Sequence, residues 1–339
     1  RDGRLHLLRT LPAVGLERLT GAWPMTGFPE DRFGVAFAGH WDEESRRRWR
    51  EGVARADSMG MREGVFAKIG DSNIAAYNSL YGLGLLEPVW DRHMKLEPTM
   101  RRYRRVAVPR GDDPGGQVRP GDGPGVEWNS FSRASSAARQ MIHGGHLLEP
   151  SGRFSDRVLG WLPDSENLPD ESMLHCELRI LKPRFAFVNI GTNGQVYGIT
   201  PEESVEMVAQ VVEETTRLGT VPVVMTVPPK LDPDGVGESW EYSRRLSEGL
   251  REVARGAGVP MFDQWSAFAD ERLVNFGVVE SDSGYFDGIH LETPGGFRDP
   301  ASLEKSVDFR PEALRYGANL RNLLLLMTLE ALDEALEAG

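Results

Sequence analysis

Three consecutive stretches in the middle of the chain decide the fold: FAFVNI at residues 185–190, PEESVEMVAQVVEETTRL at 201–218 and VPVVMTV at 221–227. The first and third are short, continuous apolar runs, which are typical of strands buried on both faces. The stretch between them has Thr200 as its N-cap and Pro201 at its first helical position, and Gly219 follows it. Its apolar residues share one helical face: Val205, Val208, Val211 and Val212. A strand, a helix and a strand with short links predict a parallel sheet.

The same pattern continues on both sides of this unit. The apolar runs at 64–69 and 259–262 predict two more strands, and 239–255 predicts a second crossover helix that ends at Gly256. A broad apolar face from about Pro311 to Leu336 predicts a final helix packed across the sheet. The fold class is therefore α/β, a three-layer α/β/α sandwich.

The N-terminal part of the chain has a different character. Residues 42–55 are rich in arginine and glutamate, and pairs such as Glu44 and Arg48 at i,i+4 spacing indicate a solvated helix face. We expect residues 1–60 to form an N-terminal extension packed on a main domain of residues 61–339. The first residue is Arg1 rather than methionine, which indicates removal of an upstream segment and favours a location outside the cytoplasm.

Composition excludes several classes of protein. The 339 residues carry 39 Lys+Arg and 51 Asp+Glu, for a net charge of -12, which disfavours nucleic acid as a partner. Cys176 is the single cysteine, so no intramolecular disulfide or cysteine-based zinc cluster forms, and we expect it to be a buried thiol. No run of 18 apolar residues occurs, so we predict no integral membrane segment.

Polar residues follow the predicted strands at the edge where ligands bind in an open parallel sheet. Ser72 follows the first strand within GDSN, where it is either a nucleophile or an ordinary helix-capping residue. Asn193 follows the next strand within GTNG, as an oxyanion donor or as part of a turn. Late in the chain, DGIH places Asp287 three residues before His290, so that the carboxylate can orient the imidazole. Each motif is weak alone, and the three are specific as a set.

These blocks, in this order, resemble the SGNH (GDSL) hydrolase superfamily. The resemblance runs from about residue 65 to the C-terminal helix, and NSFSRASS at residues 129–136 is similar to the second block of the family. The surrounding sequence, including RPEALRYGANLRNLLLL at 310–326, resembles a bacterial subgroup. The resemblance implies a mostly parallel five-stranded, flavodoxin-like sheet.

The resemblance also implies roles for particular residues. Ser72 is the expected nucleophile, His290 the base and Asp287 the group that orients it. The oxyanion is expected to bind Asn193, the Ser72 amide and a second-block amide, that of Ala134 or, if the frame slips by one, that of Arg133. The chain departs from the family in two places, because Gly194 stands where an aspartate is usual and Asn73 where an aliphatic residue is usual.

The expected function is a serine esterase that hydrolyses a short acyl or carbohydrate O-acyl ester through an acyl-enzyme. The expected partners are small-molecule, carbohydrate or lipid ester substrates, and no cofactor or metal is required. The alternative is a catalytically silent binding or scaffold protein on the same fold.

Two long irregular segments, residues 87–125 and 291–309, flank the catalytic blocks, and we hypothesise that they shape the substrate pocket. Four aromatic residues are candidates for a sugar platform or, equally, core anchors: Trp90, Tyr103, Trp128 and Tyr285. His143 and His146 are separated by two glycines, which disfavours a helical metal site.

Overall fold

The structure is a computed structural model, and it describes residues 43–76, 78–109, 127–133, 137, 145–149, 168, 170–230, 232, 237–268, 290–295 and 301–337. Within these residues, all four strands predicted from the apolar runs are present and pair in parallel. They are β1 (Arg62–Gly70), β2 (Pro183–Asn189), β3 (Val221–Met225) and β4 (Met261–Phe262), in the spatial order β1-β2-β3-β4.

The prediction of five strands is wrong for the described residues, which contain four. A flavodoxin-like order would place a further strand beside β1. Residues 129–133 occupy that side instead. The Phe66 amide donates to Ser130 Oγ at 3.0 Å, and Lys68 Nζ donates to the Phe131 carbonyl at 2.8 Å. Two hydrogen bonds from β1 to this segment, one from a backbone amide and one from a side chain, therefore protect the outer edge of the strand.

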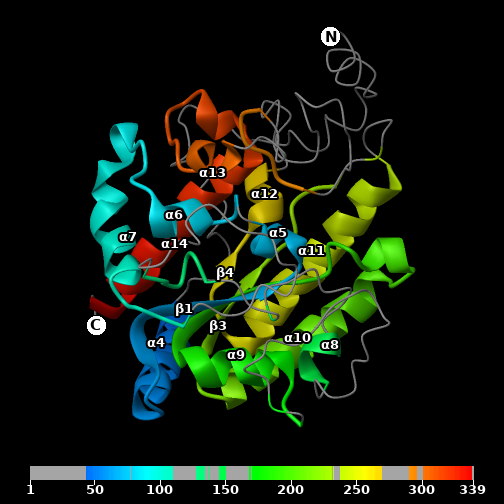
Figure 1. Ribbon diagram of the computed structural model, residues 1–339. Helices are drawn as coiled ribbons and strands as arrows, with labels where there is room; N and C mark the ends of the chain where they lie inside the picture. The colour runs from blue at the N-terminus through cyan, green and yellow to red at the C-terminus, as the bar shows by residue number, and fades with distance from the viewer. Residues whose placement is uncertain are drawn as a thin grey trace.

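Helices cover both faces of the sheet, as expected for a three-layer sandwich (Figure 1). One face packs against α4 (Glu43–Ser58), α7 (Glu97–Arg104) and α14 (Gly317–Glu337), and the other against α9 (Met173–Leu181), α10 (Pro201–Arg217) and α11 (Glu238–Ala257). Strand side chains alternate between the two cores, since Phe185 and Phe187 belong to the first and Ala186 and Val188 to the second.

The shorter elements connect these layers. They are α5 (Ser72–Ala75), α6 (Tyr81–Leu85), α8 (Gly145–Leu148), α12 (Gln264–Phe268), α13 (Ser302–Lys305) and the 3₁₀ helices η1 (Asp91–Leu96), η4 (Gly194–Tyr197) and η5 (Ala313–Arg315). The helix α10 begins as predicted, with Thr200 and Glu203 forming a reciprocal capping box and Pro201 in the first turn.

Two predicted helix boundaries are wrong. The helix α11 continues through Gly256 to Ala257, and its C-cap is Gly258, whose φ of 65° is the left-handed conformation that favours glycine. The last helix begins at Gly317 rather than near Pro311, because Tyr316 is extended and separates it from η5.

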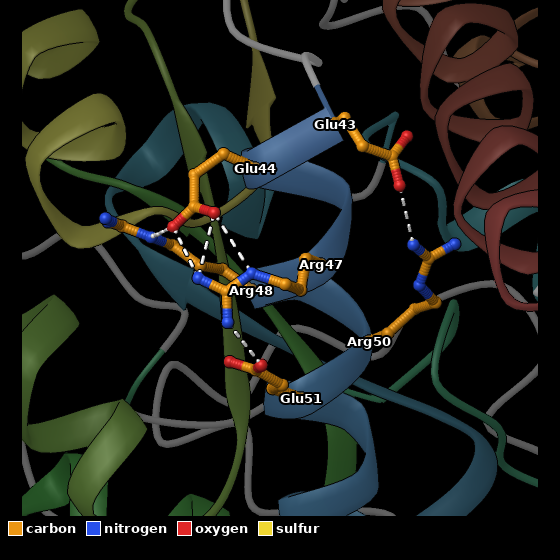
Figure 2. Close-up of polar contacts among 6 residues, drawn as sticks. All are labelled: Glu43, Glu44, Arg47, Arg48, Arg50 and Glu51. Carbon is orange, nitrogen blue, oxygen red and sulfur yellow. Dashed lines mark hydrogen bonds and ion pairs between the residues drawn. The ribbon is translucent and has the colours of Figure 1, made fainter.

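The first described helix, α4, has one charged face and one apolar face. Figure 2 shows the charged face, where Glu44 binds both Arg47 and Arg48 and where Arg50 binds Glu43. The predicted Glu44–Arg48 pair is confirmed, with Arg48 Nε 2.9 Å from the carboxylate. On the apolar face, Trp49 stacks on Phe185 of β2 with a centroid separation of 5.0 Å. The helix is therefore held to the sheet by apolar packing.

The described parts of the two long segments contribute to the core. Trp90 and Tyr103 are 5% and 1% exposed, so these two aromatic residues are core anchors and not a sugar platform. Residues 110–126 and Tyr285 lie outside the described residues. Cys176 is buried in α9, as expected. No helix among the described residues is long and apolar enough to cross a membrane.

We predict that Trp49→Ala lowers the free energy of unfolding by about 3 to 5 kcal/mol, because it removes a fully buried indole from the contact between α4 and β2. The measurement is urea unfolding followed by circular dichroism. The matched control is Arg47→Ala on the opposite face of α4, which we expect to change little because exposed ion pairs contribute little. Equal losses in the two variants would contradict the assignment of apolar packing as the main link.

Candidate active site

The turn after β1 depends on a glycine. Gly70 has a φ of 153°, and a Cβ at this position would lie 2.0 Å from the Asn189 carbonyl oxygen of β2. The close approach lets the Asp71 amide donate to the same carbonyl at 3.1 Å. The chain then enters α5 with Asp71 as the N-cap and Ser72 as the first helical residue. Ser72 therefore lies at the carboxyl edge of the sheet, half-buried.

The structure brings His290 to Ser72 across 218 positions of sequence. The Nε2 atom of His290 is 2.8 Å from Ser72 Oγ, which is hydrogen-bonding distance. The residues after His290 are held by two further bonds: Asn78 Nδ2 donates to the Leu291 carbonyl at 3.0 Å, and the Ala318 amide donates to the Glu292 carbonyl at 2.9 Å. The pair has the geometry that a nucleophile and its general base require.

A buried carboxylate joins this serine to the loop after β2. Asp71 is fully buried, and its two oxygens accept from the Asn73 amide and the Thr192 amide, each at 3.1 Å. Burial raises the pKa of Asp71, while the hydrogen bonds from Asn73 and Thr192 act in the opposite direction. Thr192 directly precedes Asn193, so the carboxylate fixes the Asn193 loop relative to Ser72.

A buried lysine holds the same loop from the other side. Lys230 is 3% exposed, and its Nζ donates to the Thr192 carbonyl at 3.0 Å and to Gln195 Oε1 at 3.2 Å. Burial lowers the pKa of Lys230 to about 8, although the nearby Asp71 and Asp232 carboxylates favour its charged form. Thr192 is therefore clamped at its amide by Asp71 and at its carbonyl by Lys230.

Asn193 lies at the start of η4, half-buried, at the same sheet edge as Ser72. The next residue, Gly194, explains one departure from the family pattern. A Cβ there would lie 2.2 Å from the Tyr242 hydroxyl and 2.9 Å from Ser204 Oγ, and these two hydroxyls are hydrogen-bonded at 3.1 Å. Tyr242 of α11 thus fills the space that a larger residue would need.

The second departure, Asn73, also has a local partner. It is 2% exposed, and its Nδ2 lies 3.5 Å from Thr192 Oγ1, the limit of a hydrogen bond. An aliphatic residue here would lack this polar contact. Asn73 therefore adds a side-chain contact to the backbone bonds that already join the Ser72 turn to the loop after β2.

The second block is described up to Arg133. The Arg133 amide donates to the Asn129 carbonyl at 2.9 Å, so this amide is already engaged within the loop. The Arg133 guanidinium forms a buried ion pair with Glu177 of α9, at 2.7 Å, which attaches the loop to that helix. This leaves Ala134 as the second-block donor to consider, and Ala134 lies outside the described residues.

Asp287 also lies outside the described residues. His143 lies outside them too. Among the residues that are described, no cluster of three or more histidine, cysteine, aspartate or glutamate side chains has the arrangement of a metal site.

Sequence reasoning missed the buried polar residues that support the site. Lys230 and Arg321 are each almost fully buried, and Asn78 links the segments of Ser72 and His290. A signal was present for two of them: Lys230 ends the apolar run TVPPK, and Arg321 stands immediately before a leucine-rich stretch. A charged residue within an apolar run is a sign of a buried polar network.

Comparison with known proteins agrees with this architecture. Residues 155–295 match the model of the GDSL-like lipase/acylhydrolase family. The matched range contains Asn193 and His290 and begins after Ser72. No curated protein matches the chain.

Two solved structures illustrate the likeness. One is described as a peptidoglycan O-acetylesterase in action, with a TM-score of 0.33, 14% identity, and coverage of 48% of this chain and 41% of that one. The chain thus covers less than half the length of that protein. The other is a serine-to-alanine mutant of the esterase AlinE4, with a TM-score of 0.27, 16% identity, and coverage of 59% and 75%.

The fold and the site define an α/β/α protein with a serine and a histidine at the carboxyl edge of a parallel sheet. Over residues 155–295, the chain is similar to the GDSL-like lipase/acylhydrolase family.

We predict that Lys230 makes stability depend on pH between about 8 and 10.5. The folded-state pKa of Lys230 is lowered to about 8, so in this window the unfolded chain binds more protons than the folded one. The free energy of unfolding of the wild type should therefore rise with pH, by about 3 kcal/mol relative to Lys230→Met across the window.

The measurement is urea unfolding of the wild type and Lys230→Met at several pH values from 7.5 to 10.5. Ionisation of other groups affects both proteins and cancels in the difference. If the free energy of unfolding changed equally with pH in the two proteins, the lowered pKa of Lys230 would be contradicted.

Proposed function

We propose that the protein is a serine esterase that hydrolyses a carboxylic ester through Ser72, His290 and Asp287 and a covalent acyl-enzyme. The observation that carries the proposal is the 2.8 Å contact between Ser72 Oγ and His290 Nε2, two residues that are 218 positions apart. An ordinary helix-capping serine has no need of an imidazole at that distance, whereas a nucleophile does.

The reaction has two halves. Ser72 Oγ attacks the ester carbonyl carbon, and its proton passes to Nε2 of His290. Collapse of the tetrahedral intermediate breaks the ester C–O bond, and the leaving alcohol takes the proton from His290. Water then attacks the acyl group on Ser72, gives a proton to His290, and the carboxylic acid leaves as Ser72 Oγ recovers that proton. Asp287 is proposed to hold Nδ1 of His290 and to stabilise the imidazolium.

The negative charge that develops on the carbonyl oxygen requires hydrogen-bond donors. The Ser72 amide, the Asn193 side chain and the Ala134 amide are the proposed donors. Among the described residues, neither the Ser72 amide nor the Asn193 side chain donates to another protein group, so both are available to a ligand. Loss of a single donor of this kind costs about 2.7 to 4 kcal/mol of transition-state stabilisation.

The proposed substrate is a short acyl ester or an O-acylated carbohydrate. The described residues next to Asn193 in the chain include Gln195, a partly exposed polar side chain, and Val196 and Tyr197, which are exposed. A surface that combines polar and aromatic groups suits an alcohol portion that carries hydroxyl groups. The resemblance to the family supports the ester chemistry, and these residues support the choice of a hydrophilic alcohol.

We predict that a fluorophosphonate adds one adduct to the wild-type protein, that Ser72→Ala abolishes the adduct, and that His290→Ala slows its formation by at least about 100-fold, the low end of the usual contribution of a general base. The measurement is intact-mass spectrometry over time. Ser239→Ala is the matched control, because Ser239 Oγ binds Asp232 at the start of α11, and it should label like the wild type.

The same proteins are then assayed on p-nitrophenyl esters of increasing chain length and on acetylated sugars. Turnover that falls with chain length and is lost in Ser72→Ala supports the proposed substrate class. Folded wild-type protein that neither labels nor hydrolyses any ester would overturn the proposal and favour a silent binding protein on this fold.

A further inference from the structure

An arginine lies buried in the apolar middle of the C-terminal helix. Arg321 of α14 is 2% exposed, and the leucines around it in sequence, Leu320 and Leu323 to Leu326, are fully buried. Within the described part of the chain, no acidic side chain forms an ion pair with it. Burial disfavours the charged form of the Arg321 guanidinium and lowers its pKa. A group that costs stability in this way calls for another explanation.

The guanidinium binds the backbone immediately after the proposed nucleophile. Its Nη1 atom donates to the Asn73 carbonyl at 2.6 Å, and Asn73 directly follows Ser72. Because α5 is a single turn, the Ser72 carbonyl is bonded by the Ala76 amide, and Arg321 supplies a donor for the next carbonyl. Arg321 thus supplies the Asn73 carbonyl with a hydrogen bond that a longer helix would supply from its own backbone.

The other terminal nitrogen of the guanidinium is connected, through Asn78, to the segment of the proposed base. Its Nη2 atom donates to the Asn78 carbonyl at 3.1 Å, and Asn78 Nδ2 donates to the Leu291 carbonyl at 3.0 Å. Leu291 directly follows His290. Asn322, the neighbour of Arg321, donates to the Asn78 carbonyl as well, at 3.0 Å, so Asn78 is held firmly. One side chain therefore connects the segment of Ser72 to the segment of His290.

We propose that Arg321 is a positioning residue that sets the placement of Ser72 relative to His290. This inference rests on the proposed function, since it assigns Arg321 a role in the same reaction. Arg321 touches neither reacting group, and it acts through the Asn73 carbonyl on one side and through Asn78 on the other. Small displacements between a nucleophile and its base cause large losses of rate, so such a residue should affect turnover more than substrate binding.

The experiment compares Arg321→Met, Arg321→Lys and a matched control. For Arg321→Met we expect kcat to fall about 100-fold with KM within about twofold, because the two carbonyls lose their shared donor. Arg321→Lys keeps the charge but has no planar fork, so it should bind one carbonyl and lose about 10-fold. All rates are measured at a temperature at which each variant is fully folded by circular dichroism.

The control is Asn319→Ala, which also removes buried hydrogen bonds of α14. Asn319 Nδ2 donates to the Lys305 and Asp308 carbonyls at 2.5 and 2.9 Å, away from Ser72 and His290. Asn319→Ala should lower the unfolding temperature and keep the wild-type kcat. The rate of fluorophosphonate labelling provides a second readout, and it should fall in the Arg321 variants and not in the control.

A merely structural Arg321 would give a different result. Arg321→Met would then lower stability and keep the wild-type kcat, or it would lose activity to the same extent as Asn319→Ala, and either result would overturn the inference. If Arg321→Met does not fold, the inference is tested with Arg321→Lys and Asn78→Ala. Asn78→Ala removes only the side-chain bond to the Leu291 carbonyl, and it should lower kcat at least about 10-fold. A wild-type kcat in both variants would overturn the inference. Inactive wild-type protein would instead mean that the proposed function itself has failed.

Discussion

The buried Asp71 carboxylate ties the end of β1 to the end of β2, and the geometry of the candidate active site depends on that link. One oxygen accepts from the Asn73 amide and the other from the Thr192 amide. Ser72 directly follows Asp71, and Asn193 directly follows Thr192, so one side chain fixes the serine relative to the amide side chain. Gly70 makes this possible, because any larger residue would collide with the Asn189 carbonyl. The link therefore requires a residue without a Cβ at position 70.

The ionisable groups around this link are costly to bury, and they hold the segments at the carboxyl edge of the sheet in place. Asp71, Lys230 and Arg321 are each almost fully buried. Burial favours the neutral form of each group, so it raises the pKa of Asp71 and lowers the pKa of Lys230 and Arg321. A core selected for stability alone would favour apolar residues at such positions. All three bind backbone groups in the segments that hold Ser72, Asn193 or His290. Their distribution agrees with the general rule that local departures from good packing gather at functional sites.

Much of the fold follows from the sequence because its signals are local. The four strands, α10 with its Thr200 cap and the charged face of α4 were predictable from apolar runs, capping residues and i,i+4 pairs. The single-turn length of α5 was not, and the Asn73 carbonyl in that turn is bonded by Arg321, nearly 250 residues later. The covering of the β1 edge by residues 129–133 was also missed, because it rests on contacts between residues more than 60 positions apart. The order of the blocks predicted that Ser72 and His290 lie together, whereas the supporting roles of Lys230 and Asn78 arise only from tertiary contacts.

The most direct test of the account is a crystal structure of the protein after reaction with a fluorophosphonate. We expect phosphorus bonded to Ser72 Oγ, the phosphoryl oxygen within about 2.7 to 3.1 Å of the Ser72 amide and of Asn193 Nδ2, and His290 Nε2 beside the Ser72 oxygen. In the same structure, Asp287 should lie within hydrogen-bonding distance of His290 Nδ1. Phosphorus on another residue, or a phosphoryl oxygen directed away from Asn193, would contradict the account.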